Sequence, residues 1–266
     1  MNTNDLSLTE RELAQGYCLS CITKPKSDLF IDEVNLFEGL LPDIQIRPAK
    51  ISRLEFISSE VLRVILRLPP TNGLNYLPGQ YIDLSYKDIK RSYSIVSSPT
   101  MDTIELIIRK YDNGKFSNYL FKEAKVNDLL RIEGPKGTYI FSKKTEDYLL
   151  FLSTGTGIAP NICILKNILE NNLVKPENIH FVHGQRYASE HIYDLELLFP
   201  KIKIIKAISR EDVVGFSKGY VQNVALDFGI ELNRTKVYAC GSPDMIIESK
   251  KVLVKHGLKE SNFKSE

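Results

Sequence analysis

The chain has 266 residues, 43% of them hydrophobic, and a formal net charge of +2. That length is sufficient for two domains of about 100–200 residues each. The near-neutral charge gives no electrostatic reason to expect nucleic acid or a membrane surface as a partner. No stretch approaches the ~18 consecutive apolar residues of a membrane-spanning helix. The first residues lack the basic and apolar regions of a secretion signal, so we expect reduced cysteines and a cytoplasmic protein.

Residues 1–44 form a segment of their own, with a short helix predicted at 9–13 and short strands at 17–23 and 28–34. Cys18 and Cys21 form a CxxC pair, which in a cytosolic protein can bind a metal or undergo redox chemistry. A zinc site needs two further ligands, and no second CxxC or CxxH lies nearby. We therefore expect no metal site in this chain.

Residues 45–142 contain six short stretches of alternating polar and apolar residues, separated by turns rich in proline and glycine. Strands of this length and spacing predict an antiparallel β-barrel. The predicted strands are 50–57, 61–68, 81–85, 92–97, 103–109 and 128–133. One predicted helix, 116–121, interrupts them.

Residues 143–266 alternate predicted strands and helices, a pattern typical of an open parallel sheet that binds ligands at the carboxyl ends of its strands. Strands are predicted at 148–153, 179–183, 202–207 and 236–240, and helices at 158–171, 189–198, 219–228 and 243–256. A last edge strand is predicted around Phe263.

Residues 148–160, YLLFLSTGTGIAP, are the stretch around which the chain is organised. The uninterrupted apolar run is typical of a strand buried on both faces. The glycine turn after it leads into an apolar helix, and such a turn presents backbone N–H groups and a positive helix end to a phosphate. Gly155 and Gly157 let a pyrophosphate approach the backbone without a Cβ in the way. The spacing is not GxGxxG, so an ordinary tight βα turn is the alternative.

Two stretches of the predicted barrel are also suited to a phosphate. Arg91-Ser92-Tyr93-Ser94, at the start of a predicted strand, offers the planar fork of an arginine and the flat ring of a tyrosine. Gly114-Lys115-Phe116-Ser117 begins the predicted helix and offers a second helix N-terminus. Each also fits an edge strand or a plain hairpin turn when taken alone.

Four motifs occur in an order that resembles the ferredoxin–NADP⁺ reductase superfamily: RSYS at 91–94, the glycine–serine turn at 114–117, STGTGIAP at 153–160 and CGSPDM at 240–245. From about residue 47 onward, the chain is similar to the iron–sulfur flavoprotein branch, which includes CDP-6-deoxy-glucoseen reductases and phenol hydroxylase reductase components. The resemblance implies an antiparallel β-barrel that binds FAD, followed by an α/β domain with an open parallel sheet that binds NAD(P).

On the flavin side, the resemblance implies that Arg91 holds the flavin pyrophosphate, Tyr93 stacks on the isoalloxazine, and Ser94 bonds near flavin N5. Ser92 belongs to the same motif. The helix start would cap the diphosphate with backbone N–H groups, and its residues are Gly114, Lys115, Phe116 and Ser117.

On the coenzyme side, the resemblance assigns residues 155–157, Gly155-Thr156-Gly157, to the nicotinamide nucleotide. Cys240 and Gly241 would lie beside the nicotinamide, where hydride passes to the flavin, and Cys240, Ser94 and Tyr93 would be the catalytic residues. No acidic residue follows the second strand of this half to bind a ribose diol. The sequence does not decide between NADH and NADPH as the coenzyme. The residues further along the chain that are expected to contact the coenzyme are Arg186, Ser209, Arg210 and Tyr220.

Residues 13–29 resemble the tail of a plant-type [2Fe–2S] ferredoxin domain, in which Cys21 would be the fourth cluster ligand. The other three ligands would lie well upstream, so no [2Fe–2S] cluster is expected in this chain. The resemblance therefore implies a reductase whose ferredoxin domain has been lost or cut off, and which passes electrons to a separate iron–sulfur protein or another acceptor. Two alternatives remain open: a non-catalytic remnant that binds flavin or a partner, and a free-flavin reductase. Phe263 is expected in the last strand rather than on the flavin.

Overall fold

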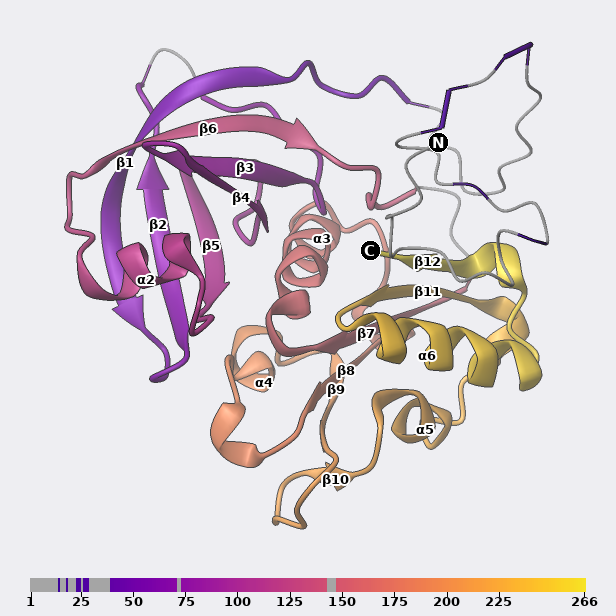
Figure 1. Ribbon diagram of the computed structural model, residues 1–266. Coiled ribbons are helices and arrows are strands. Elements are labelled where there is room, and N and C mark those ends of the chain that lie inside the picture. The colour runs from indigo at the N-terminus through magenta and orange to yellow at the C-terminus, as the bar shows by residue number, and fades with distance from the viewer. Residues whose placement is uncertain are drawn as a thin grey trace. The chain divides into compact units, whose positions relative to one another are not determined.

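The structure, a computed structural model, describes residues 39–70, 73–142 and 147–266, and a few isolated positions before residue 29 (Figure 1). The chain divides into two compact units, Met1–Leu36 and Phe37–Glu266, and the fold below is that of the second unit. The helix and strands predicted between residues 9 and 34 lie almost entirely outside the described residues. Of the CxxC pair only Cys18 is described, as an exposed free thiol. Across the described ranges, no group of three or more His, Cys, Asp or Glu side chains could hold a metal ion.

The first sheet is antiparallel and has six strands in the order β4-β3-β6-β1-β2-β5. The strands are β1 (Gln45–Phe56), β2 (Val61–Arg67), β3 (Tyr81–Tyr86), β4 (Ile89–Ser94), β5 (Thr103–Arg109) and β6 (Leu129–Lys136). An isolated bridge between Ile95 and Leu106 brings the chain beyond one edge strand back to the other edge. The sheet therefore curls into a half-barrel, as Figure 1 shows.

The half-barrel has an apolar interior because alternate residues of its strands point inward. Leu62, Val64 and Leu66 of β2 are fully buried. The helix α2 (Lys115–Lys122) adds Phe116 to the same apolar cluster. This helix is therefore held by the barrel core, and its N-terminus is fixed in place.

The second sheet is parallel and has the strand order β10-β9-β8-β7-β11-β12. Its strands are β7 (Tyr148–Thr154), β8 (Ile179–Gln185), β9 (Lys203–Ile208), β10 (Ser217–Lys218), β11 (Thr235–Cys240) and β12 (Phe263–Ser265). The order reverses at β7, with β8 on one side and β11 on the other. Open parallel sheets bind ligands at such a reversal, outside the carboxyl ends of the strands. The half-barrel followed by an open parallel sheet is the fold expected from the sequence, and Phe263 lies in the last strand as predicted.

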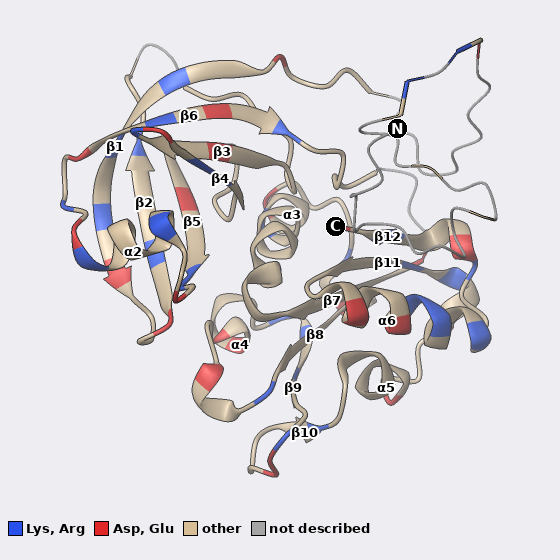
Figure 2. Ribbon diagram, in the orientation of Figure 1, with Lys and Arg blue, Asp and Glu red and all other residues tan. Residues whose placement is uncertain are grey.

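Helices cover both faces of the parallel sheet (Figure 1). They are α3 (Ile158–Glu170), α4 (Leu195–Leu198), α5 (Val221–Leu226) and α6 (Pro243–Lys255), with single 3₁₀ turns η1 (Gly155–Gly157), η2 (Pro176–Asn178), η3 (Ala188–Glu190), η4 (Leu232–Arg234) and η5 (Glu260–Asn262). No helix in the described part of the chain is long and apolar enough to cross a membrane. Figure 2 shows basic and acidic segments interspersed over both halves, in keeping with the net charge of +2.

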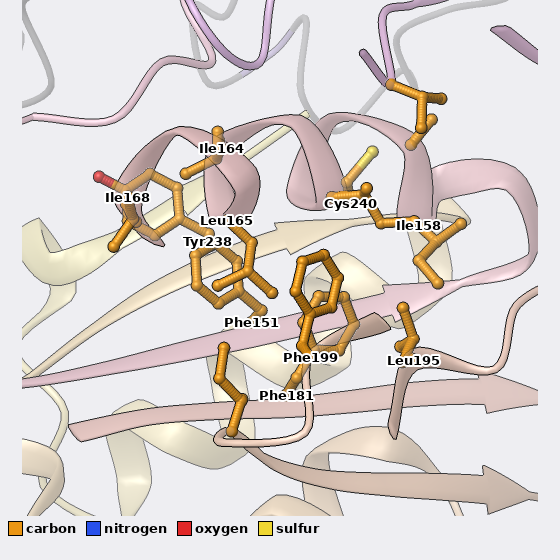
Figure 3. Close-up of a cluster of buried hydrophobic side chains, with 14 of the residues drawn as sticks. Phe151, Ile158, Ile164, Leu165, Ile168, Phe181, Leu195, Phe199, Tyr238 and Cys240 are labelled. Carbon is orange, nitrogen blue, oxygen red and sulfur yellow. The ribbon is translucent and has the colours of Figure 1, made fainter. Parts of the chain in front are cut away.

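The strand β7 is covered on both faces, and this explains why its sequence is apolar without interruption. Leu149 and Phe151 belong to the cluster that contains α3, whereas Leu150 and Leu152 belong to the cluster with α5 and α6. The ring of Phe151 stacks against those of Phe181 and Tyr238, with centroid distances of 5.6 and 5.5 Å, beneath α3 (Figure 3).

The helix predicted at 189–198 is wrong, because only η3 and the four residues of α4 are helical there. His191 between them is extended, with ψ at 127°. The Asp194 side chain then accepts a hydrogen bond from the Leu197 N–H, so a new, short helix starts after Asp194. The helix predicted at 219–228 starts two residues late, at Val221, because Gly219 has a φ of +142° and cannot continue a helix.

We predict that Phe151→Ala lowers the free energy of unfolding by about 3–5 kcal/mol, since it removes a ring packed between two others in a fully buried site. Urea denaturation measures the change. Leu197→Ala is the control, because that side chain is 79% exposed and its removal should cost less than about 0.5 kcal/mol. Equal losses in the two variants would contradict the packing described here.

Candidate functional site

A cleft of about 1540 Å³ lies between the half-barrel and the carboxyl edge of the parallel sheet. It is lined by the end of β4, the start of α2, the turn after β7 and the end of β11, so the four sequence motifs meet around one space. Of the residues predicted for the site, Lys115 alone is not part of the lining. Its side chain is exposed on α2, whereas its neighbours Gly114, Phe116 and Ser117 face the cleft.

Residues 91–94 lie at the end of β4 and not at the start of a strand as predicted. The hairpin turns at Lys87, where φ is +52°, so the strand begins already at Ile89. This strand is an edge of the sheet, which leaves one side of its backbone without a neighbouring strand. The guanidinium of Arg91 donates to the Lys90 carbonyl at 2.7 Å and is otherwise exposed in the cleft.

The side chains of Ser92 and Tyr93 are each fixed by a neighbour. The Ser92 hydroxyl donates to Asp83 at 2.6 Å. Burial opposes the ionisation of Asp83, but hydrogen bonds from Lys136 and Ser92 hold its pKa below the ordinary value. The Tyr93 ring lies 6.0 Å from that of Phe116, and burial raises its pKa, so the hydroxyl stays protonated. The motif therefore presents a cation, a hydroxyl and a flat ring on a rigid strand.

Ser117 shapes the turn before α2. Its hydroxyl accepts a hydrogen bond from the Tyr111 N–H at 3.2 Å and donates to the Gly114 carbonyl at 3.0 Å. The side chain is buried, and its bonds are made within its own loop. What this turn offers to the cleft is consequently its backbone at the helix start.

The turn after β7 touches the end of β11. Gly155 has a φ of +54°, which favours glycine. A Cβ on Gly157 would lie 2.5 Å from the carbonyl oxygen of Cys240, so only glycine allows this approach. Cys240 is 7% exposed, and burial raises the pKa of its thiol well above the usual value. A glycine turn and a neutral thiol are thus adjacent at the point where the strand order reverses.

The loops after β8 and β9 are joined by backbone hydrogen bonds. The Ser209 N–H donates to the Gln185 carbonyl at 3.1 Å, and the Arg210 N–H donates to the Arg186 carbonyl at 3.0 Å. Both arginine side chains are exposed and line the cleft. Tyr220 stands at the mouth of the cleft with 65% of its surface exposed. This end of the cleft therefore combines two cations with a flat ring.

Two further residues of the cleft lining were not among the predicted site residues. Arg109 ends β5, and its Nη1 lies 3.8 Å from where a Cβ of Gly155 would stand, so the half-barrel contributes a cation to the glycine turn. Gln222 lines the cleft with its Oε1 buried and without a hydrogen-bond partner. The sequence signal for both is faint: an arginine at a strand end and one of two adjacent amides at a helix start.

Beneath the cleft lies a buried histidine on β8. His183 Nδ1 is 2.9 Å from the Ser153 hydroxyl, and Nε2 is 2.9 Å from Nε2 of Gln185, which lines the cleft. Burial lowers the pKa of His183 to about 3. The ring is therefore neutral at physiological pH, and it holds the Gln185 amide in place.

Family models match both halves of the chain. An oxidoreductase FAD-binding domain matches residues 48–141, and an oxidoreductase NAD-binding domain matches residues 151–251. The CDP-6-deoxy-L-threo-D-glycero-4-hexulose-3-dehydrase reductase of Yersinia pestis is 37% identical over an aligned length of 265 residues, and the alignment covers 97% of this chain and 80% of that protein. The toluate 1,2-dioxygenase electron transfer component of Pseudomonas putida is 26% identical, over 97% of this chain and 78% of that protein.

Solved structures share the fold. A ferredoxin NADP⁺ reductase from Neisseria gonorrhoeae, with bound FAD and NADP, superposes with a TM-score of 0.72 at 19% identity, covering 83% of this chain and 98% of that one. The ferredoxin reductase in carbazole 1,9a-dioxygenase gives a TM-score of 0.74 at 24% identity, covering 84% and 69%.

We predict that the free energy of unfolding falls as the pH drops below about 6.5, the pKa of histidine in an unfolded chain. Below this pH the unfolded state binds a proton at His183, whereas the folded state does not bind it until the pH reaches about 3. The expected loss from this residue between pH 7 and pH 5 is about 2 kcal/mol. Denaturant unfolding of the wild type and His183→Gln over this range measures it, and the variant should show a shallower slope. His256→Gln, at an exposed position, should keep the wild-type slope. An unchanged slope in His183→Gln would refute the assignment.

Proposed function

The chain belongs to the family of oxidoreductases that combine an FAD-binding with an NAD-binding domain, and we propose how its cleft passes a hydride from NADH or NADPH to FAD. The observation that carries the proposal is that residues 91–94 of the half-barrel and the turn at residues 155–157 open onto the same cleft, which Cys240 at the end of β11 also lines. We assign FAD to residues 45–142 and the coenzyme to residues 143–266, with residues 1–44 as a preceding segment.

The residues of the half-barrel fit FAD. The Arg91 guanidinium is exposed in the cleft and would supply a fork for the FAD diphosphate, to which the backbone at the start of α2 would add N–H donors. The Tyr93 ring, backed by Phe116, offers a flat face for the isoalloxazine, and the Ser94 hydroxyl lies on the same strand. When bound, FAD accepts the hydride at N5 and passes electrons onward singly.

The residues of the parallel sheet fit the coenzyme. The turn at 155–157 and the nearby Arg109 receive the coenzyme diphosphate with N–H groups and a positive charge. Cys240 presents a neutral, largely water-excluded sulfur to the nicotinamide, so no charge competes with the approach of the ring. The unpartnered Oε1 of Gln222 gains a hydrogen bond when a nucleotide amino or hydroxyl group enters.

The far end of the cleft binds the adenosine part of the coenzyme. Arg186, Arg210 and the Ser209 hydroxyl surround it, and the exposed ring of Tyr220 offers a stacking face. No acidic side chain ends β8, and Arg186, Ser209 and Arg210 offer hydrogen-bond donors to a ribose hydroxyl or a 2′-phosphate.

Electrons leave this protein for a separate acceptor, an iron–sulfur protein or another redox partner. Support comes from relatives whose names describe reductase or electron transfer components of multicomponent systems. We place the reaction in the cytoplasm, which suits the free thiols of Cys18, Cys163 and Cys240.

An absorbance spectrum of the purified full chain, titrated anaerobically with NADH and then with NADPH, tests the proposal. We expect a flavin spectrum that bleaches with one of the two coenzymes at stoichiometric amounts. Flavin that is lost on desalting would favour a free-flavin reductase, and bound flavin that neither coenzyme bleaches would favour a non-catalytic binding protein. Either result would overturn the proposal.

We predict that Arg91→Ala weakens FAD binding about 10–100-fold, the effect of losing a hydrogen bond to a charged group. Fluorescence titration of the flavin-free protein with FAD measures the change. Arg67→Ala is the matched control. Arg67 lies on β2 outside the cleft lining, and its guanidinium donates a hydrogen bond to the Asn127 side chain at 2.8 Å. Equal affinities in the two variants would remove Arg91 from the site.

A further inference from the structure

A buried carboxylate joins the half-barrel to the parallel sheet. Glu105 of β5 is 7% exposed, and its Oε1 accepts hydrogen bonds from Arg63 Nε at 2.7 Å and from the Tyr193 hydroxyl at 2.5 Å. Lys166 Nζ lies 3.7 Å from its other oxygen. Arg63 belongs to β2 of the half-barrel, whereas Lys166 is on α3 and Tyr193 lies before α4. We call these four residues the Glu105 cluster.

The charge on Glu105 is secured by its partners. Burial opposes ionisation, but the hydrogen bond from Arg63 and the charge of Lys166 outweigh it and keep the pKa below the ordinary value. The Tyr193 hydroxyl therefore donates to an ionised carboxylate, which makes a short and strong hydrogen bond. Removing its donor leaves a buried charge with one partner fewer.

One face of α3 extends this junction along the helix. Cys163, Lys166 and Glu170 are three and four residues apart, so they project from the same side. The Cys163 thiol donates to the Ser97 carbonyl at 2.9 Å, and Glu170 accepts from the Ser98 hydroxyl at 2.5 Å. Lys166 Nζ also donates to the Val96 carbonyl at 3.3 Å. The helix is thus fastened to residues 96–98 of the half-barrel.

The two fastened segments are continuous with the two parts of the proposed site. Residues 96–98 are separated by Ile95 alone from residues 91–94, which carry Arg91 and Tyr93. The helix α3 begins immediately after the glycine turn at 155–157. A shift at this junction therefore changes the separation between the flavin-side strand and the coenzyme-side turn.

We propose that the Glu105 cluster is a positioning device for hydride transfer, in which Tyr193 before α4 and Lys166 on α3 hold the parallel-sheet half, and with it the coenzyme turn, at a fixed distance from the flavin strand. This proposal rests on the proposed function. Hydride transfer requires close contact of the reacting atoms, so a displacement of about 1 Å can lower the rate about 100-fold. None of the four residues is part of the main cleft lining; they act on the reaction through the elements they hold.

The substitution Tyr193→Phe removes one hydroxyl and keeps the ring. Its matched control is Tyr119→Phe, because the Tyr119 hydroxyl donates to Asp128 at 2.8 Å within the half-barrel. Stopped-flow reduction of the FAD-loaded full chain gives the limiting rate and the apparent coenzyme affinity separately. We expect a limiting rate about 10-fold lower in Tyr193→Phe, unchanged FAD affinity, and less than a twofold change in Tyr119→Phe.

Amide hydrogen exchange supplies a readout that does not depend on turnover. In Tyr193→Phe we expect faster exchange at residues 96–100 and in α3, and in Tyr119→Phe no change there. Faster exchange with an unchanged limiting rate would assign the cluster to stability alone and overturn the proposal. Unchanged exchange would show that the junction does not depend on Tyr193, and would overturn it as well.

The same measurements separate this proposal from the proposed function. If wild-type protein holds FAD but neither coenzyme reduces it, the proposed function fails whatever the exchange data show. If the wild type is reduced and both tyrosine variants are reduced at the wild-type rate, the function stands and the positioning role is overturned.

Discussion

Burial of β7 on both faces is the constraint from which the arrangement of the site follows. A strand covered on one side by α3 and on the other by α5 and α6 has to be apolar along its length, and Leu149 to Leu152 meet that demand residue by residue. Because β7 is central, its carboxyl end lies between those of β8 and β11. The polar residues that the parallel sheet contributes to the cleft can therefore only be placed where these strands stop.

The close approach of the turn at Gly157 to β11 shapes the surface that the strand ends present to the cleft. The contact with the Cys240 carbonyl leaves no room for a side chain, so the two strand ends form one continuous floor. The histidine below it is neutral and hydrogen-bonded on both ring nitrogens. A floor of this kind presents backbone donors and fixed amides to a ligand without placing an opposing charge under it.

Much of the fold could be predicted from the sequence, because its signals are local. The apolar run of β7, the glycine turn and the spacing of the barrel strands are each visible within a dozen residues. The helix predicted at 189–198 failed because Asp194 offers a cap that restarts the helix, and periodicity alone does not register a cap inside an apolar pattern. The start of β4 was misplaced because its hairpin turns at Lys87, a non-glycine residue at positive φ.

The site was predictable where residues match a motif and unpredictable where they meet only in three dimensions. Arg91 and Cys240 belong to recognisable stretches. Arg109 and the Glu105 cluster do not, because Glu105 lies 42 residues from Arg63 and 88 residues from Tyr193 along the chain. Ser117 and Lys115 show the opposite limit: both stand in a motif, yet the first bonds its own loop and the second points to solvent.

The protonated state of Cys240 has a consequence for how long such a protein lasts. Peroxide oxidises a cysteine through its thiolate, and the product passes through sulfenic to irreversible sulfinic acid. Burial keeps the Cys240 sulfur in the thiol form, so this sulfur resists oxidation by peroxide. The apolar surroundings of one side chain thereby protect a residue of the cleft from irreversible modification.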